Sequence, residues 1–138
     1  MIGKIERLSL VVLAGVLGLS GCSTDPPGMR SDEFAIADYP RLVAVEGLDK
    51  AVVASKPIVT PGTDDKPMRV TVPVRSLHLG GPLNVQYRFR FMGADGRPLA
   101  SNVGWRFVRL EPKVQVFLDG NALETSAADW RLEVRPAR

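Results

Sequence analysis

The ten residues from Leu83 to Met92, LNVQYRFRFM, constrain the fold more than any other stretch of the chain. Apolar and aromatic residues occupy every second position from Leu83 to Phe91, and polar residues occupy the positions between them. Successive side chains of a strand point to opposite sides, so a period of two is typical of a strand with one buried face. The stretch therefore predicts a long, half-buried β-strand.

Six further segments alternate in the same way or form short apolar runs between turn residues. They span residues 42–45, 52–54 (continued by 58–60), 68–75, 105–110, 113–118 and 130–135. Pro73 lacks a backbone donor, which predicts that strand 68–75 lies at a sheet edge or beside a bulge. The Asp95-Gly96 pair predicts a tight turn after the longest strand. We therefore expect an all-β, immunoglobulin-like antiparallel sandwich of about seven strands.

The aromatic residues of these strands are expected to fill the core of the sandwich. A row of aromatic residues that stacks against a ligand is the alternative. The chain has a single cysteine, so no disulfide within the chain can reinforce this core. The residues expected in the core are Tyr87, Phe89, Phe91, Trp105, Phe107 and Trp130.

The N-terminus has the pattern of an export signal. Lys4 and Arg7 precede an apolar run from Leu8 to Leu19. A bilayer-spanning helix needs about 20 apolar residues, whereas the apolar region of a signal peptide has about 7–15. The alternative, a buried helix, does not explain the basic residues before the run or the Ser20-Gly21 step after it. Residues 1–21 are therefore predicted to be a cleaved signal peptide.

The segment Leu19-Ser20-Gly21-Cys22 resembles the lipobox of bacterial lipoproteins. The resemblance implies that Cys22 becomes the first residue of the mature chain and carries a diacylglycerol and a third acyl chain. Attachment by more than one acyl chain is stable. Ser23, rather than an aspartate, implies the periplasmic face of the outer membrane. The alternative is an ordinary free cysteine.

The segment after Cys22 lacks any regular apolar period and contains Pro26-Pro27-Gly28. We expect residues 22–40 to be a flexible tether, which would reach about 56 Å from Cys22 to Tyr39 at full extension. Residues 41–138 are then expected to form the sandwich domain.

Three segments together resemble the YcfL family: VQYRFRFMGADGRPL, the Gly104-Trp105 step and the closing AADWRLEVR. The resemblance covers residues 42–135 and implies a small bacterial envelope lipoprotein with an immunoglobulin-like sandwich. It implies a location and a fold but no catalytic residues. Related genes often lie near those of outer-membrane lipoproteins that activate peptidoglycan synthases, which points to cell-wall assembly.

The polar face of the predicted sheet is rich in arginine. Guanidinium groups bind carboxylates and phosphates through two parallel hydrogen bonds, so this face is the candidate interaction site. An ordinary solvated face with cross-strand ion pairs is the alternative. The residues of the candidate face are Gln86, Arg88, Arg90, Arg106, Arg131 and Arg135.

No catalytic or metal-binding pattern emerges from the sequence. His78 is the single histidine, and a pair with Ser76 lacks a neighbouring carboxylate to orient it. One histidine and one cysteine predict no zinc site, and Asp64-Asp65 lacks the spacing of a calcium loop. The formal net charge of +3 without a Lys/Arg-rich block does not indicate nucleic acid as a partner. We therefore expect that the protein binds no cofactor and is not an enzyme.

The sequence thus predicts a non-enzymatic envelope protein that is anchored to a membrane through Cys22 and acts as an adaptor. Its expected partner is an envelope protein or a cell-wall component, contacted through the arginine face or by strand addition at 68–74. The alternative is a module that binds an anionic cell-wall or lipid fragment through the arginine face.

Overall fold

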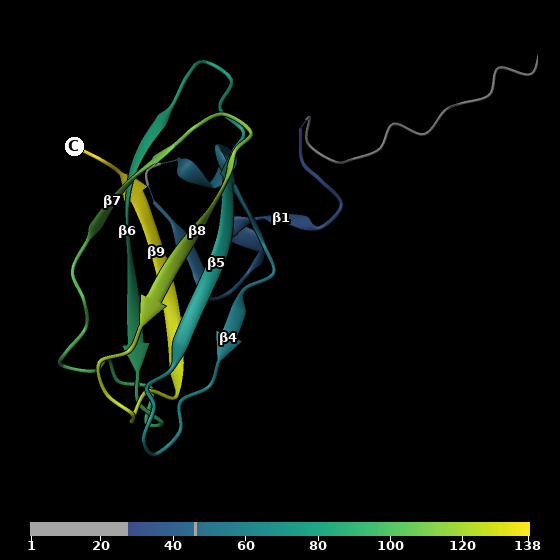
Figure 1. Cartoon of the computed structure of the whole chain (residues 1–138). Helices are drawn as coiled ribbons and strands as arrows, with labels where there is room; N and C mark the ends of the chain where they lie inside the picture. Colours follow the sequence, from purple (N-terminus) through teal and green to yellow (C-terminus); the bar gives the residue numbers. More distant parts are fainter. Residues whose placement is uncertain (1–27, 46) are drawn as a thin grey trace, which may run out of the picture.

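The computed structural model describes residues 28–45 and 47–138, which fold into a β-sandwich (Figure 1). The predicted signal peptide and Cys22 lie outside the described residues. The strands are β1 (Glu33–Ala35), β2 (Leu42–Ala44), β3 (Val52–Ser55), β4 (Ile58–Thr60), β5 (Arg69–Ser76), β6 (Leu83–Met92), β7 (Arg106–Leu110), β8 (Gln115–Asn121) and β9 (Asp129–Pro136). Two one-turn 3-10 helices, η1 (Ile36–Asp38) and η2 (Leu48–Lys50), join the first three strands.

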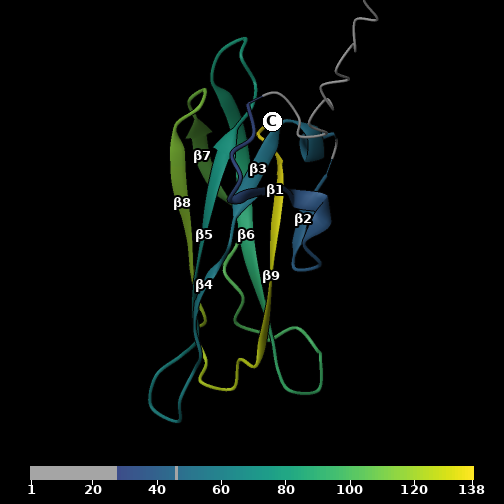
Figure 2. The same cartoon turned by 90° about the vertical axis from the view of Figure 1, so that its right-hand side faces the viewer.

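The nine strands form two sheets that pack face to face (Figures 1 and 2). In sheet A, β5 pairs with β8 along one side and with β3 and β4 along the other, and β1 pairs with β3. Sheet B has the order β2–β9–β6–β7. The β2–β9 pair is parallel, and all other pairs are antiparallel. The predicted all-β sandwich is confirmed, with nine strands instead of about seven and one parallel pair.

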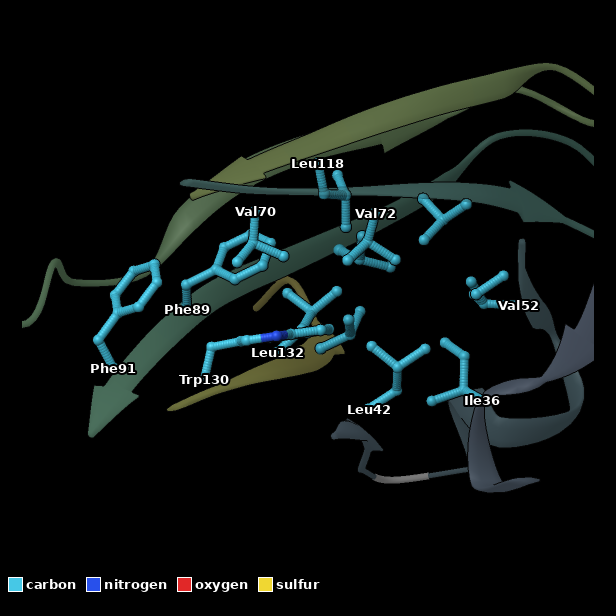
Figure 3. Close-up of a cluster of buried hydrophobic side chains, with 14 of the residues drawn as sticks. Ile36, Leu42, Val52, Val70, Val72, Phe89, Phe91, Leu118, Trp130 and Leu132 are labelled. Atoms are coloured by element: carbon cyan, nitrogen blue, oxygen red, sulfur yellow. The ribbon is translucent and has the colours of Figure 1, made fainter. Parts of the chain in front are cut away.

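The core lies between the sheets and comes from alternate residues of the long strands (Figure 3). Val70, Val72 and Val74 of β5 are buried, and Leu132 of β9 is buried on the facing sheet. Leu42 and Ile36 close the core at the side of β2. The alternation that predicted the strands therefore also identifies the inward side chains of β5, β6 and β9.

The prediction that strand 68–75 lies at a sheet edge is wrong, because β5 is the central strand of sheet A. Its partner on one side changes from β4, whose first residue lies opposite Thr71, to β3, whose pairing with β5 stops opposite Val74. Val72 and Pro73 lie at this change and pair only with β8. Proline is tolerated there because the break between β3 and β4 leaves a place without ladder hydrogen bonds.

Phe89, Phe91 and Trp130 lie in the core as predicted, and Tyr87 is half-buried against it. The rings of Phe89 and Trp130 meet with centroids 6.1 Å apart. The prediction is wrong for Phe107, which is exposed, and for Trp105, which is half-buried outside the core cluster.

The N-terminal segment belongs to the folded domain, so the predicted tether over residues 22–40 is wrong for its described part. Strand β1 pairs with β3, and Ile36 is completely buried. Glu33 forms a buried ion pair with Arg75, with Oε2 and Nη2 2.5 Å apart. The domain therefore begins before residue 41.

The predicted turn at Asp95-Gly96 is present. The backbone N–H of Gly96 donates to the carbonyl oxygen of Gly93 at 2.9 Å, and Gly96 has φ of 76°. This positive φ is accessible to glycine without strain. Met92 and Pro98 close the turn through an isolated bridge.

Candidate functional site

The outer face of sheet B carries most of the predicted arginine face. Arg88 of β6 lies directly opposite Glu133 of β9, with Gln86 opposite Arg135 and Arg90 opposite Arg131. Their neighbours along both strands point into the core, so these six side chains project to the same outer side. Five of the six predicted residues therefore share one face, namely Gln86, Arg88, Arg90, Arg131 and Arg135.

Arg106 is the exception, and its predicted outward position is wrong. Val108 and Leu110 point toward the core, so the alternation of β7 places Arg106 on the inner side and Phe107 on the outer side. The Nη1 of Arg106 donates to the carbonyl oxygen of Asp119 on β8 at 3.1 Å. Arg106 thus bridges the two sheets at their open edge. Apolar Leu110 is the sequence signal for the correct alternation, because it places Arg106 and Val108 on its own, inner side of the strand.

Trp105 is the central residue of the face, and the sequence prediction placed it in the core. The guanidinium carbons of Arg88 and Arg135 lie 4.4 Å and 3.9 Å from the centroid of its ring. Each contact is a cation–π interaction, in which the ring attracts the positive charge. A tryptophan one residue before a strand whose alternation is fixed by Leu110 was the signal for this position.

Each stacked arginine also donates a hydrogen bond to its partner on the neighbouring strand. The Nε of Arg88 donates to Oε2 of Glu133 at 2.6 Å, and the Nε of Arg135 donates to Oε1 of Gln86 at 3.0 Å. Arg90 lies farther from the same glutamate, with Nη1 and Oε1 3.5 Å apart. Stacking and hydrogen bonding together restrict the side chains of Arg88 and Arg135. We name Gln86, Arg88, Trp105, Phe107, Glu133 and Arg135 the Arg–Trp face.

A second feature lies beside the Arg–Trp face. Arg90 and Arg131 are direct cross-strand neighbours, a like-charge arrangement that is destabilising by itself. They line a surface hollow of about 210 Å³ together with Met92, Gly96 and Pro98. We name this the Arg90–Arg131 hollow.

Of the two carboxylates nearest to Arg131 in sequence, Asp129 and Glu133, the first is engaged by another arginine. Asp129 forms an ion pair with Arg41, with Oδ1 and Nε 2.7 Å apart. The hydrogen bond from Arg41 lowers the pKa of Asp129, and the charge of Arg131 lowers it further. Asp129 therefore stays ionised, and its close ion pair is with Arg41 and not with Arg131.

Ser76 and His78 do not form a catalytic pair. Ser76 is completely buried, and its Oγ accepts a hydrogen bond from the backbone N–H of His78 at 3.0 Å. The side chain of His78 belongs to an exposed residue at the end of the sandwich. Among the described residues, no hydrogen bond joins Oγ of Ser76 to the imidazole of His78, as a nucleophile and its base would require.

Within residues 28–45 and 47–138, no cluster of three or more His, Cys, Asp or Glu residues is placed to hold a metal ion. The same part of the chain contains no helix that is long and apolar enough to cross a membrane.

Comparisons with known proteins find relatives of the same fold. The model of the family described as "Protein of unknown function (DUF1425)" matches residues 42–136. The crystal structure of Campylobacter jejuni Cj0090 superimposes with a TM-score of 0.58 at 22% identity, over 69% of this chain and 96% of that one. A DUF1425 family member from Shewanella sp. PV-4 gives a TM-score of 0.54 at 20% identity, over 63% and 79% of the two chains. No curated protein sequence matches the chain.

The two structural relatives support the fold, and the family match extends from β2 to the last residue of β9. The matched region contains the whole of the Arg–Trp face and the Arg90–Arg131 hollow. Since the family model spans most of the sequence, the chain belongs to the DUF1425 family.

Proposed function

We propose that the chain is a non-enzymatic, lipid-anchored protein of the bacterial cell envelope whose sandwich acts as an adaptor. In this proposal it is a YcfL-like member of its family, and Cys22 carries the acyl chains at the periplasmic face of the outer membrane. The Arg–Trp face contacts another envelope protein.

The observation that carries the proposal is the cluster of aromatic and arginine side chains on the outer side of sheet B. Phe107 lies opposite Gln86 on the outer side of β7 and is 62% exposed, and Trp105 precedes it by two residues. Tryptophan, phenylalanine and arginine are enriched in protein–protein interfaces, where tryptophan and arginine often dominate the binding energy. A face of this composition suits contact with another protein.

The side chains of the cluster are already restricted before any partner binds, which also supports an interface. Arg88 and Arg135 are stacked on Trp105 and hydrogen-bonded to Glu133 and Gln86. Side chains that are already restricted lose less conformational entropy on association, so more of the contact energy appears as affinity. The expected partner surface carries carboxylates that face the guanidinium groups and an apolar spot that covers Phe107.

The alternative function, binding of an anionic cell-wall or lipid fragment, is favoured by the Arg90–Arg131 hollow. Arg90 and Arg131 place two guanidinium groups side by side, and the ion pair of Arg90 with Glu133 is long, at 3.5 Å, so the two groups suit a carboxylate or phosphate. In this alternative, inorganic phosphate shifts the side-chain NMR signals of Arg90 and Arg131 selectively. Equal, small shifts of all exposed arginines would contradict the alternative.

Chemical crosslinking in intact cells, followed by affinity capture and mass spectrometry, tests the adaptor. The informative variant is Arg131→Glu/Arg135→Glu, because it reverses the charge of Arg135 in the face and of Arg131 beside the face but leaves Arg88 and Glu133, which form an ion pair, in place. Lys66→Glu/Arg69→Glu is the matched control, since both residues are exposed and Arg69 belongs to sheet A.

The adaptor proposal predicts that one envelope protein is captured by the wild type and the control but is lost in the Arg131→Glu/Arg135→Glu variant. Equal capture by all three proteins would remove the Arg–Trp face as the contact surface. Anchoring is tested separately with Cys22→Ser, which should move the protein from the membrane fraction to the soluble fraction. Retention of Cys22→Ser in the membrane fraction would contradict lipid anchoring.

A further inference from the structure

The first described residue lies at one end of the sandwich and is fixed there. The carbonyl oxygen of Gly28 accepts a hydrogen bond from the guanidinium group of Arg75, near the end of β5. A buried ion pair holds Arg75 to Glu33 on β1. Gly28 is therefore attached to the end of the domain at which β5 finishes.

This position limits the distance between the domain and Cys22. Cys22 precedes Gly28 by six residues, which span about 20 Å at full extension. The distance expected from the sequence, about 56 Å, assumed that the folded part began near residue 40. The inference that follows rests on the proposed lipid anchor at Cys22: a lipid at that residue would hold the Gly28 end of the sandwich close to the bilayer.

Two loops form this end of the sandwich beside Gly28. They join β5 to β6 and β7 to β8, and Figures 1 and 2 show both at the end where the described chain begins. The backbone N–H of Lys113 donates to the carbonyl oxygen of Ser76 at 3.3 Å, which ties one loop to the end of β5. A hollow of about 230 Å³ between them is lined by Gly28, Arg75, Leu77, Leu79 and Lys113.

The two loops expose apolar side chains and a lysine. Leu79 is 74% exposed and Val114 is 53% exposed, and Lys113 beside Val114 is also exposed. Glu111 in the same loop is ion-paired with Arg109, with Oε1 and Nε 2.7 Å apart. Apolar side chains next to a cation match a bilayer surface, where the former enter the acyl boundary and the latter meets anionic headgroups.

We propose that Leu79, Lys113 and Val114 form a membrane-contacting tip that rests on the same bilayer in which Cys22 is anchored. The six-residue connection keeps the tip within reach of the membrane, and the exposed leucine and valine enter its interface. When this end of the sandwich contacts the bilayer, the strands meet the membrane with their ends and not with a sheet face. Both sheet faces, including the Arg–Trp face, then remain open to the periplasm.

The experiment uses the lipidated mature chain on vesicles of phosphatidylethanolamine and phosphatidylglycerol. Because Cys22 is the single native cysteine and its thiol is acylated, Leu79→Cys introduces one reactive thiol for an environment-sensitive fluorophore. Leu123→Cys is the matched control. Leu123 is 63% exposed and follows β8 at the opposite end of the sandwich, where the backbone N–H of Ala122 donates to the carbonyl oxygen of Met68. Lipids with a quencher in the acyl chain report contact with the bilayer.

The proposed tip predicts at least about threefold stronger quenching at position 79 than at position 123, since interfacial side chains lie roughly 5–10 Å deep. Val114→Cys should behave like Leu79→Cys. Equal quenching at 79 and 123 in protein that floats with the vesicles would overturn the tip and leave the anchor intact. Protein that does not float with the vesicles would overturn both proposals. A label at 79 that is shielded from water but not quenched by lipid would indicate a second copy as the occupant and overturn the membrane tip.

Discussion

At the scale of single residues, the contact between Gly120 and Phe89 sets the spacing of the two sheets. A Cβ atom added at Gly120 would lie 2.3 Å from Cγ of the Phe89 ring, and two further ring atoms lie within 3.0 Å. Phe89 is buried against Trp130 and cannot move aside freely. The glycine is therefore required by the close approach of β8 to an aromatic ring of the opposite sheet.

Gly120→Ala should lower the free energy of unfolding by about 1–3 kcal/mol, the usual cost of overpacking a core. Urea unfolding, followed by the tryptophan fluorescence of the chain, measures this change. The matched control is Gly104→Ala, because nothing lies within 4 Å of a Cβ at Gly104. An unchanged midpoint for Gly120→Ala would show that the sheets separate easily at this contact.

At the scale of elements, the buried ion pair of Glu33 and Arg75 connects strand β1 to β5, the central strand of sheet A. The hydrogen bond from Arg75 is the main reason that the pKa of Glu33 falls from 4.5 to about 2. The ionised glutamate therefore stabilises the fold above pH 4.5, and this contribution is lost as the pH falls toward 2. A shift of this size corresponds to about 3 kcal/mol.

The Glu33→Gln variant should show a much weaker loss of stability between pH 5 and pH 2 than the wild type. It should also be less stable at pH 7 by about 3–5 kcal/mol, because Arg75 loses the charge that compensates its burial. Urea unfolding over this pH range gives both values. Glu111→Gln is the control, since its ion pair is exposed and should contribute less than about 1 kcal/mol. Parallel pH profiles of wild type and Glu33→Gln would exclude the pair as the cause.

The start of the folded domain gives a second prediction for the N-terminal element. A chain that begins at residue 41 lacks β1, buried Ile36 and Glu33, and it leaves Arg75 without a carboxylate partner. It should be at least about 4 kcal/mol less stable than a chain that begins at residue 28, by the sum of an unpaired buried charge and lost apolar burial. Thermal unfolding of the two chains compares them. Equal melting temperatures would restore residue 41 as the domain boundary.

The strands were predictable where alternation is long and were missed where it is short. The ten residues of β6 and the eight of β9 reveal their period in the sequence, and their paired outer residues follow from it. Strand β1 has three residues, too few to display a period, and its position depends on Arg75, 42 residues away in the chain. The central position of β5 depends on the break between β3 and β4, which Pro73 alone does not predict.

The same reasoning explains which site residues were predictable. Gln86, Arg88, Arg90, Arg131 and Arg135 were predicted from alternation in long strands and share one face. Arg106 is the first residue of β7 and Trp105 precedes it, and the choice between two alternations there depends on which residues of the strand meet the core. Alternation counted from Leu110 indicates the outer side for Trp105, but the stacking of two guanidinium groups on its ring could only be found from the structure.

At the scale of the whole molecule, the proposed membrane tip and the proposed contact face use different parts of the sandwich. Gly28, Leu79 and Val114 lie at one end, whereas the Arg–Trp face covers the outer side of sheet B. Contact with a membrane at the end therefore leaves the face accessible to a partner. The central claim is that this partner binds sheet B and not sheet A.

Site-specific photocrosslinking in cells tests this claim most directly. A benzophenone amino acid replaces Phe107 on the outer side of β7 or, as the matched control, Phe117 on β8, which is 55% exposed and lies opposite Pro73 on sheet A. We predict that the probe at 107 crosslinks one envelope protein, that Arg131→Glu/Arg135→Glu abolishes this product, and that the probe at 117 does not form it. The same product from both probes, or from 117 alone, would contradict the Arg–Trp face as the contact surface.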